Sequence, residues 1–475
     1  MLIALTIIAS FLILCQWYVF QRVREYLFEK HAPVSRKVAY SVLALIGTLN
    51  LAALVLITDS GLFPVDTFRQ KAASVAFFSY LGIILLLGAF FLFLGLLWHT
   101  LHLKDALLTS PSCPRTGSGL LRRCQRGSVS SPWQRRAQES PGGGEAEKNL
   151  PEPRSDSKVG EGSRSQRTSP PLSRRKFFKW STAAGIVAVV GSGLEAVSEA
   201  YQPPIIEEFD VFNPRLAGLR EPVTIVHVTD FHYGMFLNSA DLEKLVERVN
   251  AIPGDAVIIT GDVFHSPMTP VESAVPLLRG LKERRLGNFA VMGNHDFYAG
   301  ERRCADAMRS GKLTLLRNKW ITFKERDATI HLGGIDDPMV NWIWGKAFPT
   351  FPRFMAEAPR TPGLRILLSH RPSVLPIAAQ HEIDFVLSGH IHGGQIILSP
   401  GGPELGVSLA RVVSPFTHGW YRRGASHMYL NRGVGLTFVP WRINCPSEIA
   451  VFHLRSDGDR DGPVRRRTRR HYRAA

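Results

Sequence analysis

The apolar residues of this 475-residue chain follow two different patterns. In the first hundred residues they form three nearly continuous runs, at residues 1–20, 38–58 and 76–98. A membrane-spanning helix needs about 20 apolar residues, so these runs predict three transmembrane helices within residues 1–100. From residue 201 to residue 455, short β-branched runs alternate with amphipathic segments, which predicts an α/β domain. Ser239 is the candidate cap of the first helix in that domain.

Polar and basic segments flank these two regions. Residues 101–172 are rich in Ser, Pro, Gly and Arg and cannot bury a core, which predicts a disordered basic linker. Basic side chains also fill the loop between the first two apolar runs, so we expect this loop and the linker on the cytoplasmic side. Residues 456–475 predict a disordered basic tail. No nucleic-acid-binding motif accompanies the net charge of +17, so we expect the membrane bilayer as a partner and no specific nucleic acid.

The segment at the entrance of the α/β domain has an export-like pattern. Arg174 and Arg175 precede Lys-Phe-Phe-Lys and a mildly apolar run at residues 181–194. This pattern resembles a twin-arginine signal, which would make the twin-arginine export machinery a partner. The alternative is an ordinary fourth membrane helix with a basic flank. Both interpretations make residues 173–198 cross a bacterial-type inner membrane, with the domain on its extracytoplasmic side.

Five apolar strands in the domain end in side chains that can bind metals. The strands lie at residues 223–229, 255–260, 287–292, 364–369 and 384–388, and each runs into Asp, Asn or His. Ligands of open α/β sheets bind at the carboxyl ends of strands, so we expect these side chains to meet at one edge. The candidate metal ligands are Asp230, His232, Asp262, Asn294, His370, His390 and His392.

The type of donor atom narrows the metal chemistry. Oxygen and nitrogen donors without a thiolate suit two neighbouring Mn, Fe, Zn or Co ions, with Mn favoured, better than Ca or a structural zinc. The five cysteines form no Cys-x-x-Cys pair, which argues against a zinc ribbon or a disulfide framework. His295 lies beside a candidate ligand and is the expected acid. Asp255, Asp296 and Asp384 are interpreted as helix caps or turn residues.

The order of these motifs resembles the calcineurin-like metallophosphoesterase superfamily. The blocks that carry the resemblance are Asp230-Phe-His232, Gly261-Asp262, Gly293-Asn294-His295-Asp296, Ser369-His370 and Gly389-His-Ile-His392. The resemblance implies a four-layer α/β/β/α sandwich with two metals at the sheet edges. It implies that Asp262 bridges both metals. The remaining ligands would be Asp230, His232 and His392 for one metal, and Asn294, His370 and His390 for the other.

Further blocks resemble membrane-associated bacterial members of this superfamily. They are Gly334-Ile-Asp-Asp-Pro338, Gly393-Gly-Gln395, Asn431-Arg-Gly433, Pro440-Trp-Arg442 and Pro446-Ser-Glu448. Some such members carry twin-arginine signals, and some relatives hydrolyse the pyrophosphate of UDP-2,3-diacylglucosamine, a lipid A precursor. The three N-terminal apolar runs and the long linker depart from the single-anchor plan of those proteins.

Together these features predict a membrane-anchored hydrolase of phosphomonoesters, phosphodiesters or pyrophosphates that acts on a lipid-linked substrate. The expected nucleophile is a hydroxide held between the two metals, and Asp262, Asn294 and His295 are the expected catalytic residues. His295 would protonate the leaving group. Two alternatives stay open: a nucleotide or nucleic-acid phosphodiesterase, and a metal-binding membrane sensor or scaffold. Candidate substrate contacts are His265, Tyr298, Arg302, Arg303, Trp342 and Trp344.

Overall fold

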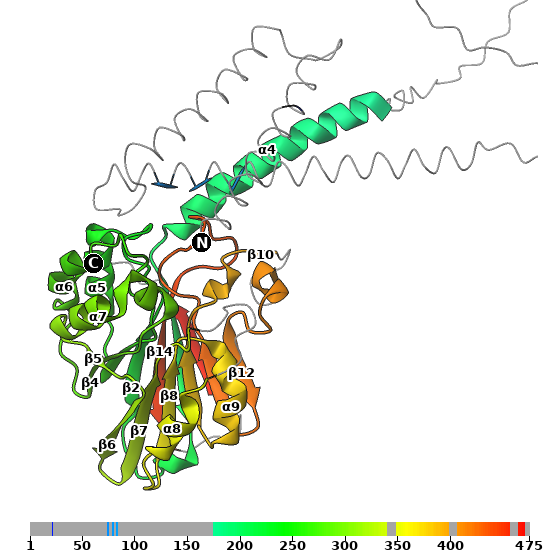
Figure 1. Cartoon of the computed structure of the whole chain (residues 1–475). Coiled ribbons are helices and arrows are strands. Elements are labelled where there is room, and N and C mark those ends of the chain that lie inside the picture. The colour runs from blue at the N-terminus through cyan, green and yellow to red at the C-terminus, as the bar shows by residue number, and fades with distance from the viewer. Residues whose placement is uncertain are drawn as a thin grey trace, which may run out of the picture. The chain divides into compact units, whose positions relative to one another are not determined.

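The computed structural model describes residues 21, 74–75, 78–79, 82–83, 174–339, 348–398, 406–456 and 464–470 (Figure 1). The predicted linker and nearly all of the three N-terminal apolar runs lie outside these residues. The first long described element is helix α4, Arg174–Ala200, which begins at the arginine pair of the export-like segment. Among the residues that the structure describes, no helix is both long and apolar enough to span a membrane.

Two β-sheets form the centre of the domain (Figure 1). The first has the strand order β15 (Val464–Arg470), β1 (Ile205–Phe212), β14 (Glu448–Arg455), β2 (Val223–Val228), β3 (Ala256–Ile259), β4 (Gly287–Ala290) and β5 (Thr314–Leu315). The second has the order β12 (Gly419–Arg423), β13 (Ser426–Leu430), β9 (Phe385–Ser388), β8 (Leu364–Ser369), β7 (Ala328–Ile335) and β6 (Lys319–Glu325). A separate short ladder joins β10 (Ile397–Leu398) to β11 (Val407–Ser408). Strands β2 to β5 are parallel, and so are β7, β8, β9 and β13, so their carboxyl ends gather at one edge of each sheet.

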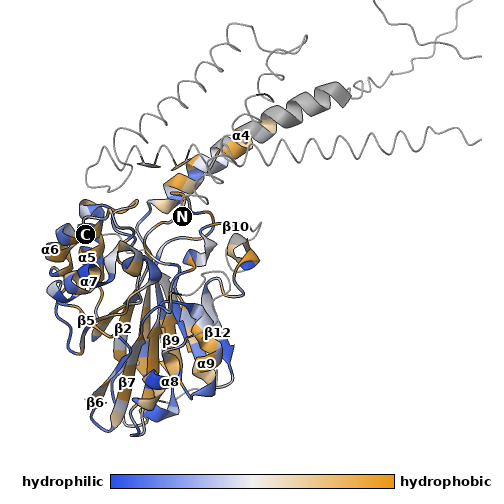
Figure 2. Cartoon of the chain, in the orientation of Figure 1, coloured by the Kyte–Doolittle hydropathy of each residue, from blue (hydrophilic) through white to orange (hydrophobic). Residues whose placement is uncertain are grey.

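Helices cover the outer face of each sheet. Helices α5 (Ser239–Ala251), α6 (Val271–Leu278) and α7 (Asn294–Ser310) share one buried apolar cluster with the first sheet. Helices α8 (Phe351–Ala356) and α9 (Leu375–Gln380) share another with the second sheet. A third cluster lies between the two sheets, whose strands carry hydrophobic residues along their length (Figure 2). The described part of the domain therefore has the layer order α/β/β/α.

The two-residue period of the strands produces this layering. Successive side chains of a strand point to opposite faces of the sheet. In β2, Ile225 packs between the sheets, whereas Val226 packs against the helices. In β8, Ile366 packs between the sheets and Leu367 faces the α8–α9 side. Both faces of these strands are thus buried, which explains why their sequences read as continuous apolar runs.

The cap of α5 differs from the expectation by one residue. Asn238, rather than Ser239, is the N-cap: its side chain accepts a hydrogen bond from the Asp241 N–H, and the Asp241 carboxylate accepts one from the Asn238 N–H, each at 3.0 Å. Such a capping box satisfies two free N–H groups at once, which a serine one residue later could not do here. The Ser239 hydroxyl instead pairs with the hydroxyl of Tyr233 at 2.8 Å.

The C-terminal segment corrects the prediction of a disordered tail. Residues 464–470 form strand β15, which pairs antiparallel with the edge strand β1. Two acidic residues of β1 hold the arginines of this strand: Arg466 lies 2.6 Å from Glu207, and Arg467 lies 2.7 Å from Asp210. The composition of the tail indicated disorder because it lacks apolar residues, but carboxylates contributed by another strand compensate for that lack.

The end of α4 is joined to the α/β/β/α domain by three hydrogen bonds. From Thr182 onward α4 belongs to the same compact unit as the sandwich. The Ala196 carbonyl accepts a hydrogen bond from the Arg442 N–H at 3.0 Å, and the Glu199 carboxylate accepts the N–H groups of Asn444 and Cys445, each at 3.0 Å. These contacts fix the α4 terminus beside the loop that follows strand β13.

Candidate metal centre

The first group of candidate ligands contains Asp230, His232 and His392. All three side chains are buried, and one ligand atom of each lies within 4.8 Å of the others. The Nε2 atoms of His232 and His392 are 2.9 Å apart, and His392 Nε2 is 3.4 Å from Asp230 Oδ1. Asp230 and His232 follow β2, whereas His392 follows β9, so the two sheets contribute to the group together.

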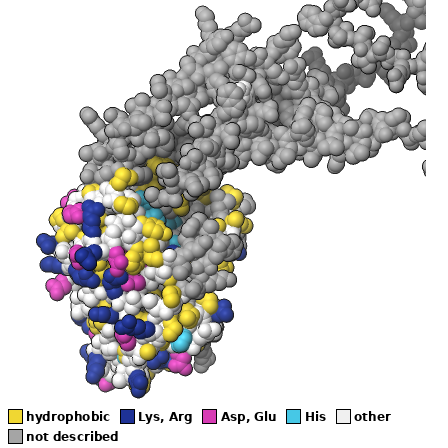
Figure 3. All heavy atoms as spheres, in the orientation of Figure 1, with side chains coloured by type: hydrophobic (Ala, Val, Ile, Leu, Met, Phe, Trp, Pro, Cys, Tyr) yellow, Lys and Arg dark blue, Asp and Glu magenta, His cyan; other side chains and the backbone are white. Residues whose placement is uncertain are grey.

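The second group contains Asp262, His370 and His390. His370 Nε2 lies 3.1 Å from Asp262 Oδ2 and 3.1 Å from His390 Nδ1. The same Asp262 Oδ2 atom is 3.6 Å from His232 Nε2 in the first group. One carboxylate oxygen therefore faces both groups, which is the position that a bridging ligand requires. Figure 3 shows a group of histidine side chains at the surface near the top of the domain in this view, whereas His232 and His370 themselves are buried.

The donor atoms fit divalent cations. The ring nitrogen Nδ1 of His370 is 2.8 Å from the Thr260 carbonyl and must donate to it, so Nε2 is the atom that faces the other ligands. Asn294 is buried at the start of α7, and its Oδ1 has no hydrogen-bond partner among the described residues. A buried amide oxygen without a partner is costly unless a further group satisfies it. Imidazole, carboxylate and amide donors in this number suit Mn, Fe, Zn or Co, as expected from the sequence.

The backbone of the candidate ligands is strained. Five of the seven have a left-handed conformation: Asp230 (φ 56°), His232 (48°), Asp262 (52°), His390 (80°) and His392 (54°). Residues other than glycine rarely adopt positive φ, at a cost of about 1–3 kcal/mol each, and such strain concentrates at functional sites. Each strand end therefore turns sharply, and the turns direct the side chains toward one another.

Two glycines allow the turns to approach closely. Gly389 lies against the carboxylate of Asp230, and a side chain there would collide with it. Gly261 has a φ of 94°, and a Cβ atom at this position would come 2.9 Å from His370 Nδ1. The glycines before Asp262 and His390 in the sequence are therefore required by packing at the site itself.

Asp296 organises the turn that carries Asp262. One Asp296 carboxylate oxygen accepts the N–H groups of Asp262 and Gly293 at 2.9 Å, and the other accepts the N–H of Phe264 at 2.9 Å. Because Gly293 is the N-cap of α7, the interpretation of Asp296 as a helix-capping residue is confirmed. Asp255 and Asp384 likewise accept the backbone N–H groups of neighbouring strands, so neither lies in the candidate centre.

The protonation pattern of the metal-free site is asymmetric. Burial raises the pKa of Asp230 to about 7. Burial also opposes the charge on His370, but the nearby carboxylates of Asp262 and Asp230 raise the pKa of that imidazole to about 10. Burial would raise the pKa of Asp262, but His370 and neighbouring histidines hold it well below its usual range. Burial lowers the pKa of His392 to about 3. These pKa shifts favour a protonated His370 imidazole beside an ionised Asp262 carboxylate.

His295 lies beside the two groups. Its backbone N–H donates to Asp262 Oδ1 at 2.8 Å, and its ring packs edge-on against the ring of His232 with centroids 4.6 Å apart. Its Nδ1 donates to the His265 carbonyl at 2.8 Å, so Nε2 is the nitrogen free for proton transfer. His265 itself, expected as a substrate contact, has its Nδ1 3.2 Å from His232 Nδ1 and contacts a candidate ligand instead.

The other expected substrate contacts have different positions. Tyr298 packs edge-on against the His295 ring and is half exposed. Arg303 is paired with Glu272 of α6, with Nε 2.6 Å from Oε1. Arg302 is exposed on α7, and Trp342 and Trp344 lie outside the described residues. Of this set, His265 and Tyr298 are the residues that the structure brings next to His232 and His295.

A buried ionic network supports the loop behind Asp230, and sequence reasoning did not assign it a role. Arg432 donates through Nε to Glu448 at 2.7 Å and through a terminal nitrogen to Glu207 at 3.0 Å. The wholly buried Arg442 donates to backbone carbonyls, including that of Gly435 at 2.8 Å. Gly435 in turn donates its N–H to the Asp230 carbonyl at 2.8 Å. The sequence feature that could have indicated this role is the pair of blocks Asn431-Arg-Gly433 and Pro440-Trp-Arg442, which contain the two arginines.

The two helix-covered sheets carry His, Asp and Asn side chains at their strand ends. This arrangement is typical of a metal-dependent phosphoester hydrolase, and comparisons with known proteins agree. The calcineurin-like phosphoesterase family model matches residues 223–394. The uncharacterized metallophosphoesterase YkuE of Bacillus subtilis (strain 168) is 30% identical over 296 residues, which cover 60% of this chain and 98% of the relative. Phosphodiesterase YaeI of Escherichia coli (strain K12) is 26% identical over 290 residues, 60% of this chain and 99% of the relative.

A vertebrate protein is also similar to this chain. The "transmembrane protein with metallophosphoesterase domain" of Danio rerio is 29% identical over 299 residues, which cover 60% of this chain and 67% of the relative. The chain belongs to the calcineurin-like phosphoesterase family and is a phosphoester hydrolase. This family uses divalent metals, and the His and Asp groups described above are the candidate sites for them.

Proposed function

We propose that this protein is a membrane-anchored phosphoesterase with two divalent metals, acting on a lipid-linked phosphomonoester, phosphodiester or pyrophosphate. The observation that carries the two-metal proposal is the position of Asp262 Oδ2, 3.6 Å from His232 Nε2 and 3.1 Å from His370 Nε2. A carboxylate oxygen between two sets of nitrogen donors is what a bridging ligand provides. Asp230 and His392 would complete one set, and Asn294 and His390 the other.

The residues of the chain have separable roles in this proposal. Divalent cations supply Lewis acidity toward phosphoryl oxygens and lower the pKa of bound water. Asp262 fixes the spacing of the two ligand sets, and the three N–H donors to Asp296 hold the turn that carries it. With Nδ1–H of His295 donated to the His265 carbonyl, Nε2 is the nitrogen that would hold the transferable proton in the imidazolium form and deliver it to the oxygen that leaves phosphorus.

Membrane anchoring and export rest on the sequence. Residues 1–100 carry three apolar runs of transmembrane length, and Arg174 and Arg175 precede the mildly apolar part of α4. The Danio rerio relative is named a transmembrane protein, which supports the proposal without deciding it for this chain. Reporters placed after Arg136 and after Leu454 should report opposite sides of the membrane. Replacing both Arg174 and Arg175 by Lys should block export of the domain under the twin-arginine interpretation, and unaffected export would indicate an ordinary membrane helix.

The substrate proposal follows from that anchoring. A site held at a bilayer meets lipid phosphates at a high effective concentration, and UDP-2,3-diacylglucosamine or a phospholipid exemplifies the class. Two arginines of the C-terminal segment, Arg466 and Arg467, are paired with Glu207 and Asp210, so the lipid proposal rests on the anchoring and not on these two side chains. The catalytic proposal and the lipid proposal therefore need separate measurements.

The direct test is a panel of phosphoesters incubated with the full-length protein, metal-free and reloaded with Mn. We expect turnover of several phosphoesters with Mn and none in the chelated protein. Asp262→Asn should be inactive, and Asp306→Asn, an exposed change on α7, should behave as the wild type. Activity that survives complete metal removal would contradict the catalytic proposal. Preference for a soluble nucleotide over lipid-linked esters in vesicles would contradict only the lipid proposal.

A further inference from the structure

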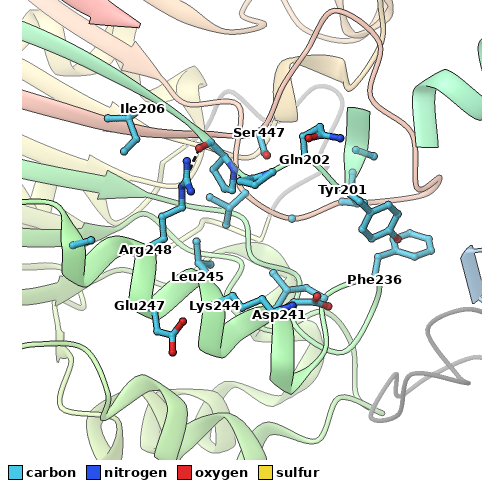
Figure 4. Close-up of a pocket in the computed structure, with 18 of the residues that line it drawn as sticks. Tyr201, Gln202, Ile206, Phe236, Asp241, Lys244, Leu245, Glu247, Arg248 and Ser447 are labelled. Carbon is cyan, nitrogen blue, oxygen red and sulfur yellow. Dashed lines mark hydrogen bonds between the residues drawn. The ribbon is translucent and has the colours of Figure 1, made fainter. Parts of the chain in front are cut away.

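A cavity of about 740 Å³ opens beside the start of strand β1 (Figure 4). Its volume is within the range of small-molecule binding sites, roughly 300–1,000 Å³. The described residues that line it come from the end of α4, the first residues of β1, one side of α5 and the loop at residues 434–436. The candidate metal ligands are not among these lining residues, so the cavity is distinct from the metal centre.

The wall of the cavity is mostly apolar, and its charged residues come from one helix. The apolar side chains include Pro203, Ile206, Leu245, Ile252, Val434 and Leu436. The charged residues Asp241, Lys244, Glu247 and Arg248 all lie on α5, as Figure 4 shows. Arg248 donates through Nε to the Pro204 carbonyl at 3.1 Å, which ties α5 to the start of β1 across the cavity. An apolar space with charges on one side suits an amphiphile rather than a nucleotide base or a sugar.

The cavity shares its wall with the metal centre. Gly435 lines the cavity, and its N–H donates to the carbonyl of the candidate ligand Asp230 at 2.8 Å. Phe236 and Leu237 also line it, and they belong to the short loop that follows the candidate ligand His232. The cavity is therefore lined by residues that directly neighbour the candidate ligands Asp230 and His232, so an apolar group attached to a phosphate at the metal centre could enter it.

The cavity also borders the N-terminal part of the chain. Phe236 packs edge-on against Phe78, with ring centroids 5.4 Å apart. Val75 and Phe78 pack against the small apolar cluster that contains Ala200, Phe236 and Leu436, all of which line the cavity. Phe78 belongs to the apolar run 76–98, which the sequence predicts to cross a membrane. The apolar side of the cavity thus borders Phe78, a residue of a run that the sequence predicts to lie in the membrane.

We infer that this cavity binds one acyl chain of a lipid phosphoester whose phosphate is positioned at the metal centre. The inference deepens the proposed function and rests on it, because it names the part of the protein that selects a lipid over a soluble ester. The apolar wall takes the chain, and the loop of Phe236 and Leu237, which follows His232, connects the cavity to the metal centre that takes the phosphate.

The test compares two esters that differ only in tail length. Butyl and dodecyl p-nitrophenyl phosphate are phosphodiesters with the same leaving group, and hydrolysis of each breaks one P–O bond and releases nitrophenolate. Burial of one methylene is worth about fourfold in affinity, so burying only two of the eight additional methylenes gives about fifteenfold. We expect the full-length, Mn-loaded protein to have at least about tenfold higher kcat/KM for the dodecyl ester, through a lower KM.

A bulky substitution at the cavity should remove this preference. Ala251 is the exposed last residue of α5 and lines the cavity, so Ala251→Trp should bring the dodecyl-to-butyl ratio to within about twofold of one. The kcat/KM for the butyl ester, whose short tail buries fewer methylenes in the cavity, should fall by less than that for the dodecyl ester. Glu243→Trp places the same ring on α5 away from the lining residues and should keep the wild-type ratio. All three proteins are measured in the same detergent, so partition of the ester into micelles cancels in the comparison.

Photo-crosslinking supplies a readout that does not depend on turnover. Dodecyl phosphate with a diazirine at the chain end, irradiated with the metal-free full-length protein, should label peptides that contain α5 or residues 434–436. Labelling confined to residues 1–100, or unchanged labelling in Ala251→Trp, would overturn the inference. Equal kcat/KM for both esters in the wild type would also overturn it while leaving the phosphoesterase intact. No turnover of either ester by the Mn-loaded protein would instead count against the proposed function.

Discussion

The uptake of metal by this site should release protons in an amount that depends on two side chains. In the metal-free protein the pKa of His370 is raised to about 10, because Asp262 and Asp230 outweigh the effect of burial. Burial raises the pKa of Asp230 to about 7. A ligand must be deprotonated to bind a metal, so a cation that binds here displaces whatever protons these two groups hold.

The magnitude follows from the two pKa values. At pH 7, His370 holds about one proton and Asp230 about half a proton, so these side chains should release about 1.5 protons when both metals bind. The release should fall to about 1.1 protons at pH 8 and rise to about 1.9 at pH 6. Because protons compete with the cation, metal affinity should increase with pH, by about tenfold per pH unit for each proton displaced.

Isothermal titration calorimetry of the full-length protein with Mn measures this release when buffers of different ionisation enthalpy are compared. His370→Asn should lower the release at pH 7 by up to about one proton, less whatever Asp230 and Asp262 take up once the His370 charge is gone, whereas His381→Gln, at the exposed histidine that caps the end of α9, should not alter it. A proton lost from water that accompanies the metal is common to the variants and cancels in their difference. Equal release by the wild type and His370→Asn would refute the assignment of the buried proton to His370.

Three further predictions concern single residues. Asp262→Asn should reduce the metal content from about two ions per chain to fewer than one, because both ligand sets lose the shared carboxylate; elemental analysis after Mn reloading checks this, and a content unchanged from the wild type would exclude bridging. His295→Ala should keep both metals but lower kcat by roughly 100-fold, as expected for loss of a general acid; loss of metal would instead make His295 a ligand. Arg432→Met leaves the buried Glu448 without its charged partner and should lower the free energy of unfolding by about 3–5 kcal/mol. Thermal unfolding should show a clear fall in Tm, whereas the control Arg411→Met, at an exposed position, should not. An unchanged Tm for Arg432→Met would argue against the ionic network.

The sequence by itself determined which segments form the central strands and which side chains at their ends are candidate metal ligands. A strand that is buried on both faces has a nearly continuous apolar sequence. Strands β2, β3, β4, β8 and β9 could therefore be predicted from the order of apolar residues along the chain. Polar ligands directly after such strands have to meet, because parallel strands place their carboxyl ends at one edge. The clustering of the candidate ligands follows from this rule, whereas the four α/β/β/α layers were expected from the resemblance to the calcineurin-like superfamily; the binding of metals by these side chains stays a prediction.

Tertiary structure decided the features that depend on a distant partner. The arginines of residues 464–470 read as a solvated tail until β1 supplies Glu207 and Asp210, and a local window cannot contain those carboxylates. The same holds for His265, whose ring reaches His232 across two turns that are 33 residues apart in the sequence. Local patterns encode periodicity and capping, but ion pairs and ring contacts between strands depend on register and chain crossing. Register and chain crossing are fixed only when the strands pair in the folded sheet.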